Sequence, residues 1–186
     1  MSTNIYHEAI MALARQCRDH DRLPTPRGVA LLDSPLCGDR IEIELDVNDG
    51  RIARLGYWVR GCVLCRASAA VLDTLALGAC LQDIERVERQ FARLLAEAGQ
   101  VPEGWELLAA FAPLHGHRSR YGCAMLPLRA LRAALGDATQ RQPGSGALPN
   151  GGRQPARQGV SGAASMGNRP PAQDGPPMCS TLDVHQ

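Results

Sequence analysis

The feature that most constrains the fold is the stretch GDRIEIELDVNDGRIARLGYWVRG at residues 38–61. Apolar residues occupy every second position from Ile41 to Val47, with charged residues between them, which is the pattern of a strand with one buried face. The triplet NDG at 48–50 is a hairpin turn signal, and RIARLGYWV supplies the return strand. The sequence therefore predicts an antiparallel β-hairpin here.

Helical patterns surround this hairpin. The segment IYHEAIMALARQCRDH precedes it with apolar residues at helical spacing, and a further strand is predicted near residues 29–33. After Gly61, helical segments are predicted for an alanine-rich stretch that stops near Gly78, for an amphipathic stretch at 81–99 and for a shorter one at 102–114. This order predicts an α+β domain, in which a small antiparallel sheet (the hairpin plus an additional strand) packs against several α-helices.

The last predicted helix has the sequence GCAMLPLRALRAALGD, at residues 122–137. Pro127 is expected in or near its first turn, where a missing N–H does no harm. Composition changes after Asp137, because residues 138–186 contain eight Gly and seven Pro and no aromatic residue. Such a segment buries too little apolar surface to offset an ordering cost of ~1–2 kcal/mol per residue. We therefore expect one domain at 1–137 and a disordered tail at 138–186.

Charge and composition exclude several classes of function. The 20 basic residues nearly balance the 19 acidic ones, which gives no reason to expect nucleic acid or a membrane as a partner. All basic residues are arginine, so a lysine nucleophile is excluded. No signal-peptide pattern and no apolar run of ~18 residues is present. We therefore expect a cytoplasmic protein, whose seven cysteines are thiols rather than disulfides.

Three of these cysteines occur at predicted element boundaries. Cys37 lies in the turn SPLCGDR, Cys62 lies where strand gives way to helix, and Cys123 is expected at the start of the last helix. Backbone N–H groups and the helix dipole stabilise thiolates at such places. Asp39 can reach the same point as Cys37 and add an oxygen ligand. Three thiolates and one carboxylate suit zinc or an iron–sulfur cluster.

A structural explanation competes with this one for each cysteine. Free cysteine is among the most buried residue types, because it packs as a small hydrophobe. For Cys17 and Cys80, which lack the Gly-bounded context, we expect only this structural role. For Cys37, Cys62 and Cys123 taken one at a time the two explanations are evenly matched, and their common context favours a site.

The order of these motifs resembles the IscU/SufU/NifU N-terminal family of iron–sulfur scaffold proteins. SPLCGDRIEIEL, a hairpin into RGCVLCRASAAVL, and a late RYGCAMLPLRAL together carry the resemblance over residues 3–136. Sixty residues separate Cys62 from Cys123, a spacing similar to the SufU-type branch, and Arg120 matches an arginine of that pattern. The LPPVK chaperone-docking motif of IscU is absent. The resemblance implies an α+β fold of the SufE/NifU type.

The resemblance also implies roles for individual residues. Cys37, Asp39, Cys62 and Cys123 would hold zinc or a [2Fe-2S] cluster, and Cys123 would accept persulfide sulfur from a cysteine desulfurase of the SufS/IscS type. The cluster would then pass to acceptor apo-proteins. A carrier of this kind is not an enzyme in the usual sense, although a zinc-bound sulfurtransferase is the alternative.

Two further hypotheses stay open at this stage. A structural or regulatory zinc module would hold metal tightly and handle no sulfur. A thiol–disulfide oxidoreductase would use Cys62 and Cys65, but such motifs normally follow a strand in a βαβ context, and here a hairpin precedes the pair.

Three residues depart from the family pattern. Cys65 falls where the family usually has a small or polar residue. It lies one helical turn from Cys62 and is either core filler or a substitute ligand or second sulfur acceptor. His115 and His117 precede Cys123 and are expected to be solvated loop residues, with His117 the candidate for an extra ligand.

Overall fold

The sheet forms around the predicted hairpin, in a computed structural model that describes residues 8–35 and 37–141. β2 (Arg40–Asn48) and β3 (Arg51–Arg60) pair antiparallel across a turn at Asp49 and Gly50, which both have positive φ. β1 (Gly28–Asp33) pairs antiparallel with the other side of β2, so the strand order is β1-β2-β3. The hairpin and the additional strand are both confirmed.

The two faces of the sheet differ as the alternation predicts. Ile41, Ile43 and Leu45 of β2 are fully buried beneath the helices. Glu42 and Glu44, which alternate with them, lie on the opposite face. The register shifts after Asp46, so the regular alternation ends before the turn is reached.

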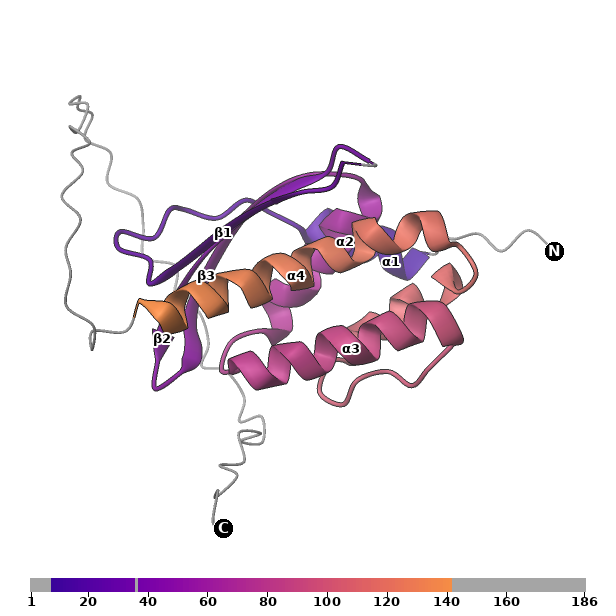
Figure 1. The fold of residues 1–186 in the computed structure, drawn as a ribbon. Helices are drawn as coiled ribbons and strands as arrows, with labels where there is room; N and C mark the ends of the chain where they lie inside the picture. The colour runs from indigo at the N-terminus through magenta and orange to yellow at the C-terminus, as the bar shows by residue number, and fades with distance from the viewer. Residues whose placement is uncertain (1–7, 36, 142–186) are drawn as a thin grey trace, which may run out of the picture. The chain divides into compact units, whose positions relative to one another are not determined.

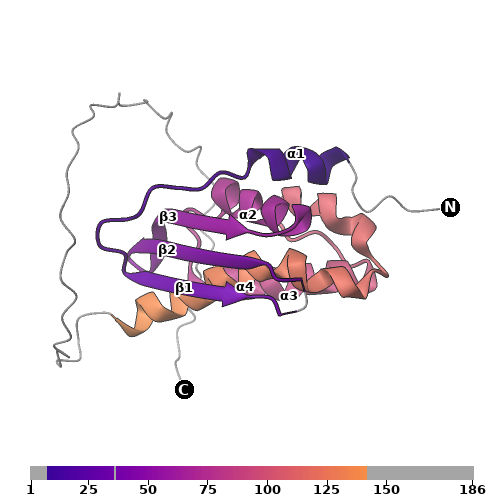
Figure 2. The ribbon, with the colours of Figure 1, turned by 90° about the horizontal axis from the view of Figure 1, so that it is seen from above.

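Among the described residues, four α-helices and one 3₁₀ helix complete the fold: α1 (Glu8–Gln16), α2 (Val63–Leu75), α3 (Leu81–Glu97), η1 (Glu106–Leu114) and α4 (Arg118–Gln140). α4 packs along β1 and β2, α2 packs against α1, α4 and β3, and α3 packs against α4 and η1 (Figures 1 and 2). The α+β prediction is confirmed. No described helix is long and apolar enough to span a membrane.

The last helix differs from its prediction at the start. α4 begins at Arg118, directly after the loop that contains Gly116 at φ +85°, and it continues through Gly122. The expectation that Pro127 lies in the first turn is wrong, because this residue is inside the helix. Proline has no N–H, so the carbonyl of Cys123, four residues earlier, lacks its helical donor.

The other end of α4 bears on the predicted domain boundary. The helix extends to Gln140, three residues beyond Asp137. Residues 142–186, which include most of the predicted tail, lie outside the described residues.

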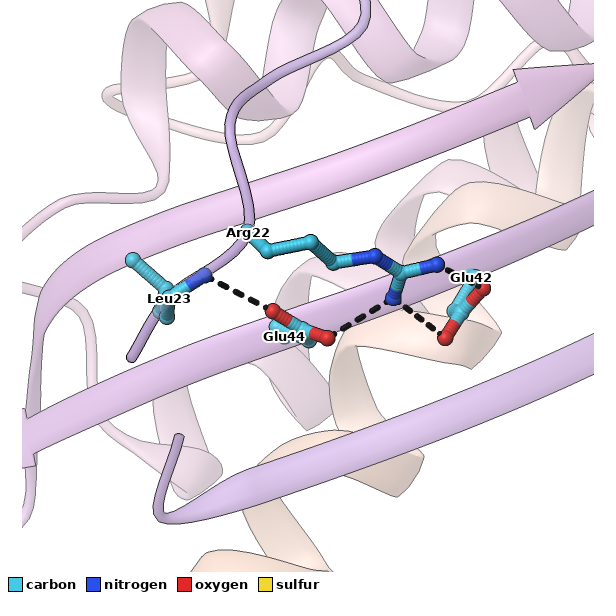
Figure 3. A network of polar contacts seen from close by, with 4 residues as sticks. All are labelled: Arg22, Leu23, Glu42 and Glu44. Carbon is cyan, nitrogen blue, oxygen red and sulfur yellow. Dashed lines mark hydrogen bonds and ion pairs between the residues drawn. The ribbon is translucent and has the colours of Figure 1, made fainter. Parts of the chain in front are cut away.

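The connection from α1 to β1 is fastened to the outer face of the sheet (Figure 3). Nη1 of Arg22 lies 2.6 Å from Glu42 and 2.7 Å from Glu44, and its guanidinium lies 3.8 Å from the centre of the Trp58 ring. The N–H of Leu23 donates to the other carboxylate oxygen of Glu44 at 2.9 Å. Both carboxylate oxygens of Glu44, which is almost fully buried, therefore accept a hydrogen bond.

Candidate metal centre

The loop between β1 and β2 carries two of the predicted site residues. Cys37 and Asp39 flank Gly38, whose φ of +69° favours glycine. The N–H of Ser34 donates to the carbonyl of Asp39 at 2.7 Å, and the N–H of Gly38 donates to the carbonyl of Ser34 at 2.9 Å. This tight turn holds the Sγ of Cys37 3.0 Å from Oδ2 of Asp39 and 3.0 Å from Oγ of Ser34.

Asp39 also connects the loop to the start of α2. Cys62 is the N-cap residue of α2, in extended backbone conformation, and its N–H donates to Oδ1 of Asp39 at 2.8 Å. A carboxylate at this position satisfies one of the free N–H groups of the helix and opposes the positive end of its dipole. Asp39 is therefore a structural link as well as a candidate ligand.

Cys123 reaches the same point from α4. Its Sγ lies 3.1 Å from the Sγ of Cys37, and its side chain is buried. A disulfide requires about 2.05 Å between the sulfurs, so this is a contact between two thiols. Cys123 lies in the second turn of α4 and not at its start, so the expectation that the helix dipole stabilises its thiolate is wrong. The packing of α4 across β1 and β2 brings it to the loop instead.

These contacts form a compact set of possible ligands. One ligand atom each from Cys37, Asp39 and Cys123 lies within 4.8 Å of the others, and the described residues contain no other such group of His, Cys, Asp or Glu. The Sγ of Cys62 is not in this group, although the backbone of Cys62 bonds to Asp39. Three of the four predicted residues therefore meet directly, and the fourth adjoins them.

The electrostatics of the centre favour a cation. Burial acts to raise the pKa of Asp39, but hydrogen bonds from the Cys37 thiol and the Cys62 N–H outweigh it and lower the pKa. Burial, contact with Cys37 and nearby Cys62 and Asp39 raise the pKa of Cys123. Burial also raises the pKa of Cys62, with a smaller contribution from Asp39. Without a cation the centre thus contains the Asp39 carboxylate and the protonated thiols of Cys62 and Cys123, and metal binding must displace their protons.

The remaining candidates lie outside the compact group. Cys65 is fully buried one turn along α2. His115 and His117 are exposed in the connection from η1 to α4, as expected for solvated loop residues. Cys17 and Cys80 are buried.

Sequence reasoning missed two local roles. Cys80 is the N-cap of α3, with its Sγ 3.1 Å from Oδ2 of Asp83, which also accepts the Cys80 N–H at 3.1 Å. The spacing of Cys80 and Asp83 is that of a capping box, which could have indicated this role. Ser34 supports Cys37, and its place before a proline in SPLCG was a turn signal.

Comparison with known proteins identifies relatives over the described domain. Residues 5–142 match the sequence model of the family described as NifU-like N terminal domain. The iron–sulfur cluster assembly scaffold protein IscU of Thermotoga maritima is 26% identical over 138 residues, which cover 70% of this chain and 92% of that protein.

Two solved structures share the fold. The N-terminal NifU-like protein of Brucella abortus has a TM-score of 0.70 at 24% identity, covering 74% of this chain and 96% of that one. An iron–sulfur cluster assembly scaffold protein for the SUF system from Fervidobacterium islandicum has a TM-score of 0.64 at 20% identity, covering 73% and 99%.

Proposed function

Because the chain belongs to the family of NifU-like N-terminal domains, we propose that it is a scaffold for iron–sulfur cluster assembly. In this proposal Cys37, Asp39, Cys62 and Cys123 hold iron or a nascent [2Fe-2S] cluster. Cys123 first accepts sulfane sulfur from a cysteine desulfurase in the cytoplasm, and the completed cluster then passes to an acceptor apo-protein. The SufU-type branch stays a prediction from the spacing of Cys62 and Cys123.

The observation that carries this proposal is the meeting of Cys37, Asp39 and Cys123. These residues come from a loop and a helix separated by more than half of the domain, yet their ligand atoms lie within 4.8 Å. Core packing alone does not call for a buried carboxylate beside two thiols, since burying a charge is costly unless it is paired or binds a cation. Soft thiolates suit iron–sulfur clusters, and one oxygen ligand makes the set easier to exchange.

The sulfur acceptor in this proposal is Cys123, which the family resemblance implies. Exposure alone would favour Cys37, which is exposed, over Cys123, which is only 2% exposed. Sulfur that leaves the persulfide of a desulfurase would form an S–S bond with Cys123 and restore the desulfurase thiol. Mass spectrometry of the protein after incubation with desulfurase and cysteine shows which cysteine carries the persulfide and so tests this assignment. A persulfide on Cys37 and none on Cys123 would contradict it.

Anaerobic reconstitution with iron and sulfide tests the scaffold role. We expect visible absorbance of a bound cluster in the wild type and its loss in Cys37→Ser. Cys80→Ser is the matched control, since it removes a buried thiol that caps α3 outside the centre. Absence of cluster absorbance in the wild type, or full absorbance in Cys37→Ser, would refute the proposal.

A zinc-bound sulfurtransferase is the second candidate, because thiolates with one carboxylate also suit tetrahedral Zn²⁺. Here zinc would order the ligands and give up Cys123 to incoming sulfur. Metal and sulfide analysis of freshly purified protein separates the two candidates. Stoichiometric zinc without sulfide, together with stimulation of a desulfurase, would favour the sulfurtransferase.

A further inference from the structure

Cys65 lies next to the candidate metal centre but has no part in the function proposed above. It is fully buried at the first turn of α2, one turn beyond Cys62. One turn further along α2, Ser68 has a buried hydroxyl without a hydrogen-bond partner within residues 8–35 and 37–141. Cys65 belongs to the buried hydrophobic core, as a cysteine that fills space does.

The Cys65 side chain is part of this core and also lies at the end of the helix where the centre is. In a helix the Cα–Cβ bond tilts toward the N-terminus, which here is the end capped by Asp39. A Cβ added to Gly61 would stand 3.1 Å from the Sγ of Cys65 and 3.2 Å from the Cγ of Asp39. The nearest atom to that Cβ would be the Cβ of Cys65, at 3.0 Å. The thiol and the carboxyl group therefore adjoin the same point, and any side chain at position 61 would crowd both.

The electrostatic surroundings of Cys65 agree with this placement. Burial raises the pKa of its thiol, and among charged groups Asp39 raises the pKa most, followed by Cys62. Without a cation Cys65 is therefore a neutral thiol that faces the one carboxylate of the centre.

From these contacts we infer that Cys65 is an alternative sulfur ligand, which replaces Asp39 on the bound metal. The inference rests on the proposed function, since it concerns the same centre. In the exchange a metal–oxygen bond to Asp39 breaks and a metal–sulfur bond to Cys65 forms. The thiol proton passes to the released carboxylate, and no electron is transferred.

The exchange would give the centre two states that bind the metal with different affinity. With Asp39 bound, three thiolates and one carboxylate hold the metal. With Cys65 bound, four thiolates hold it, a donor set that soft metals prefer. The released Asp39 keeps its hydrogen bond from the Cys62 N–H, so the loop stays attached to α2 in both states.

Cobalt(II) added to the purified full-length chain tests the inference, because the intensity of sulfur-to-cobalt charge transfer grows with the number of bound thiolates. In Asp39→Ala, Cys65 should take the vacated position, and the band should rise by about one third over the wild type as three thiolates become four. In Asp39→Ala/Cys65→Ala it should return to the wild-type intensity. Asp39→Ala/Cys80→Ala is the control and should keep the higher intensity.

Two further variants make the result specific. Asp39→Ala also removes the acceptor of the Cys62 N–H, which could disturb the centre. Asp39→Asn retains an oxygen that can accept this N–H, so it should show the higher band intensity without that disturbance. Gly61→Ala places a methyl group 3.1 Å from the Sγ of Cys65 and 3.2 Å from the Cγ of residue 39, which crowds the approach of the thiol. Gly61 does not have positive φ, so no backbone strain is expected. In the Asp39→Asn background this change should hold the band at the three-thiolate intensity although Cys65 is present.

The outcomes separate the inference from the proposed function. If Asp39→Ala and Asp39→Asn each bind cobalt with the same intensity whether or not Cys65 is present, the inference is refuted and the scaffold role is not. If the wild type shows no thiolate band, or if Cys37→Ala keeps the full band, the proposed centre itself is wrong and the inference falls with it.

Discussion

Gly28 of β1 lies directly against the backbone of α4, and its replacement tests how the domain is assembled. A Cβ on Gly28 would lie 2.1 Å from the carbonyl oxygen of Ala134 and 2.9 Å from the Cβ of Ala138. The nearest of these atoms is helix backbone, which cannot rotate away as a side chain can. Gly28→Ala therefore forces α4 away from β1 at the point where the helix and the strand are in contact.

The expected cost follows from the geometry. Overpacking of a well-packed core usually costs about 1–3 kcal/mol, and a clash against backbone belongs at the upper end of that range. We expect Gly28→Ala to lower the free energy of unfolding by about 3 kcal/mol, or the melting temperature by roughly 10 °C for a domain of this size. Thermal and urea unfolding followed by circular dichroism measure both quantities.

Gly136→Ala is the matched control for this experiment. Gly136 lies inside α4, four residues before the helix ends at Gln140, and an added Cβ there would meet nothing within 4 Å. Alanine is favoured over glycine in a helix interior by about 0.5–1 kcal/mol, so this variant should be more stable than the wild type. A melting temperature of Gly28→Ala within about 2 °C of the wild type would refute the packing argument.

Three other predictions concern the attachment of β1 to α4, the outer face of the sheet and metal binding. Asp137→Asn should cost about 1–2 kcal/mol, because Oδ2 of Asp137 accepts the Val29 N–H at 3.0 Å and a neutral acceptor is weaker; urea unfolding measures it. The hydrogen bond from Arg22 lowers the pKa of Glu42, so its stabilising contribution is present above the ordinary pKa and is lost as pH falls through the lowered one. Glu42→Gln should therefore lose less stability than the wild type between about pH 5 and pH 3, and equal slopes in thermal melts would contradict this. Zn²⁺ at 100 times its dissociation constant should stabilise the wild type by about 2.7 kcal/mol, an effect that a chelator or Cys37→Ser removes, as melting curves will show.

The hairpin was predictable because its signals are local. Alternation from Ile41 to Val47 and the NDG turn each depend on neighbours within a few residues, and strand pairing follows directly from them. The start of α4 was not, because Gly122 and Pro127 both read as boundary signals within that segment. Packing of the apolar face of α4 against the sheet and against α2 and α3 outweighs both residues.

The ligand candidates show the same limit. Context at loops and predicted element boundaries selected Cys37, Asp39, Cys62 and Cys123, and resemblance to a family strengthened all four. The expected reason for Cys123 was wrong, since helix packing and not a helix terminus brings it to the centre. The meeting of Cys65 and Asp39 beside Gly61 depends on how two different elements place their side chains, and no sequence pattern contains that information.

Asp39 would allow the proposed centre to release a metal as well as hold one. Its carboxylate has two hydrogen bonds in the absence of a cation, one from the Cys37 thiol and one from the Cys62 N–H. A ligand oxygen that leaves the metal therefore returns to partners already in place and is not left buried and unsatisfied, which would cost about 1–3 kcal/mol or more for a charged group. The loop and the helix stay connected while the metal leaves, so release does not require the domain to open. This property suits a carrier better than it suits a structural zinc site, in which the metal itself holds the elements together.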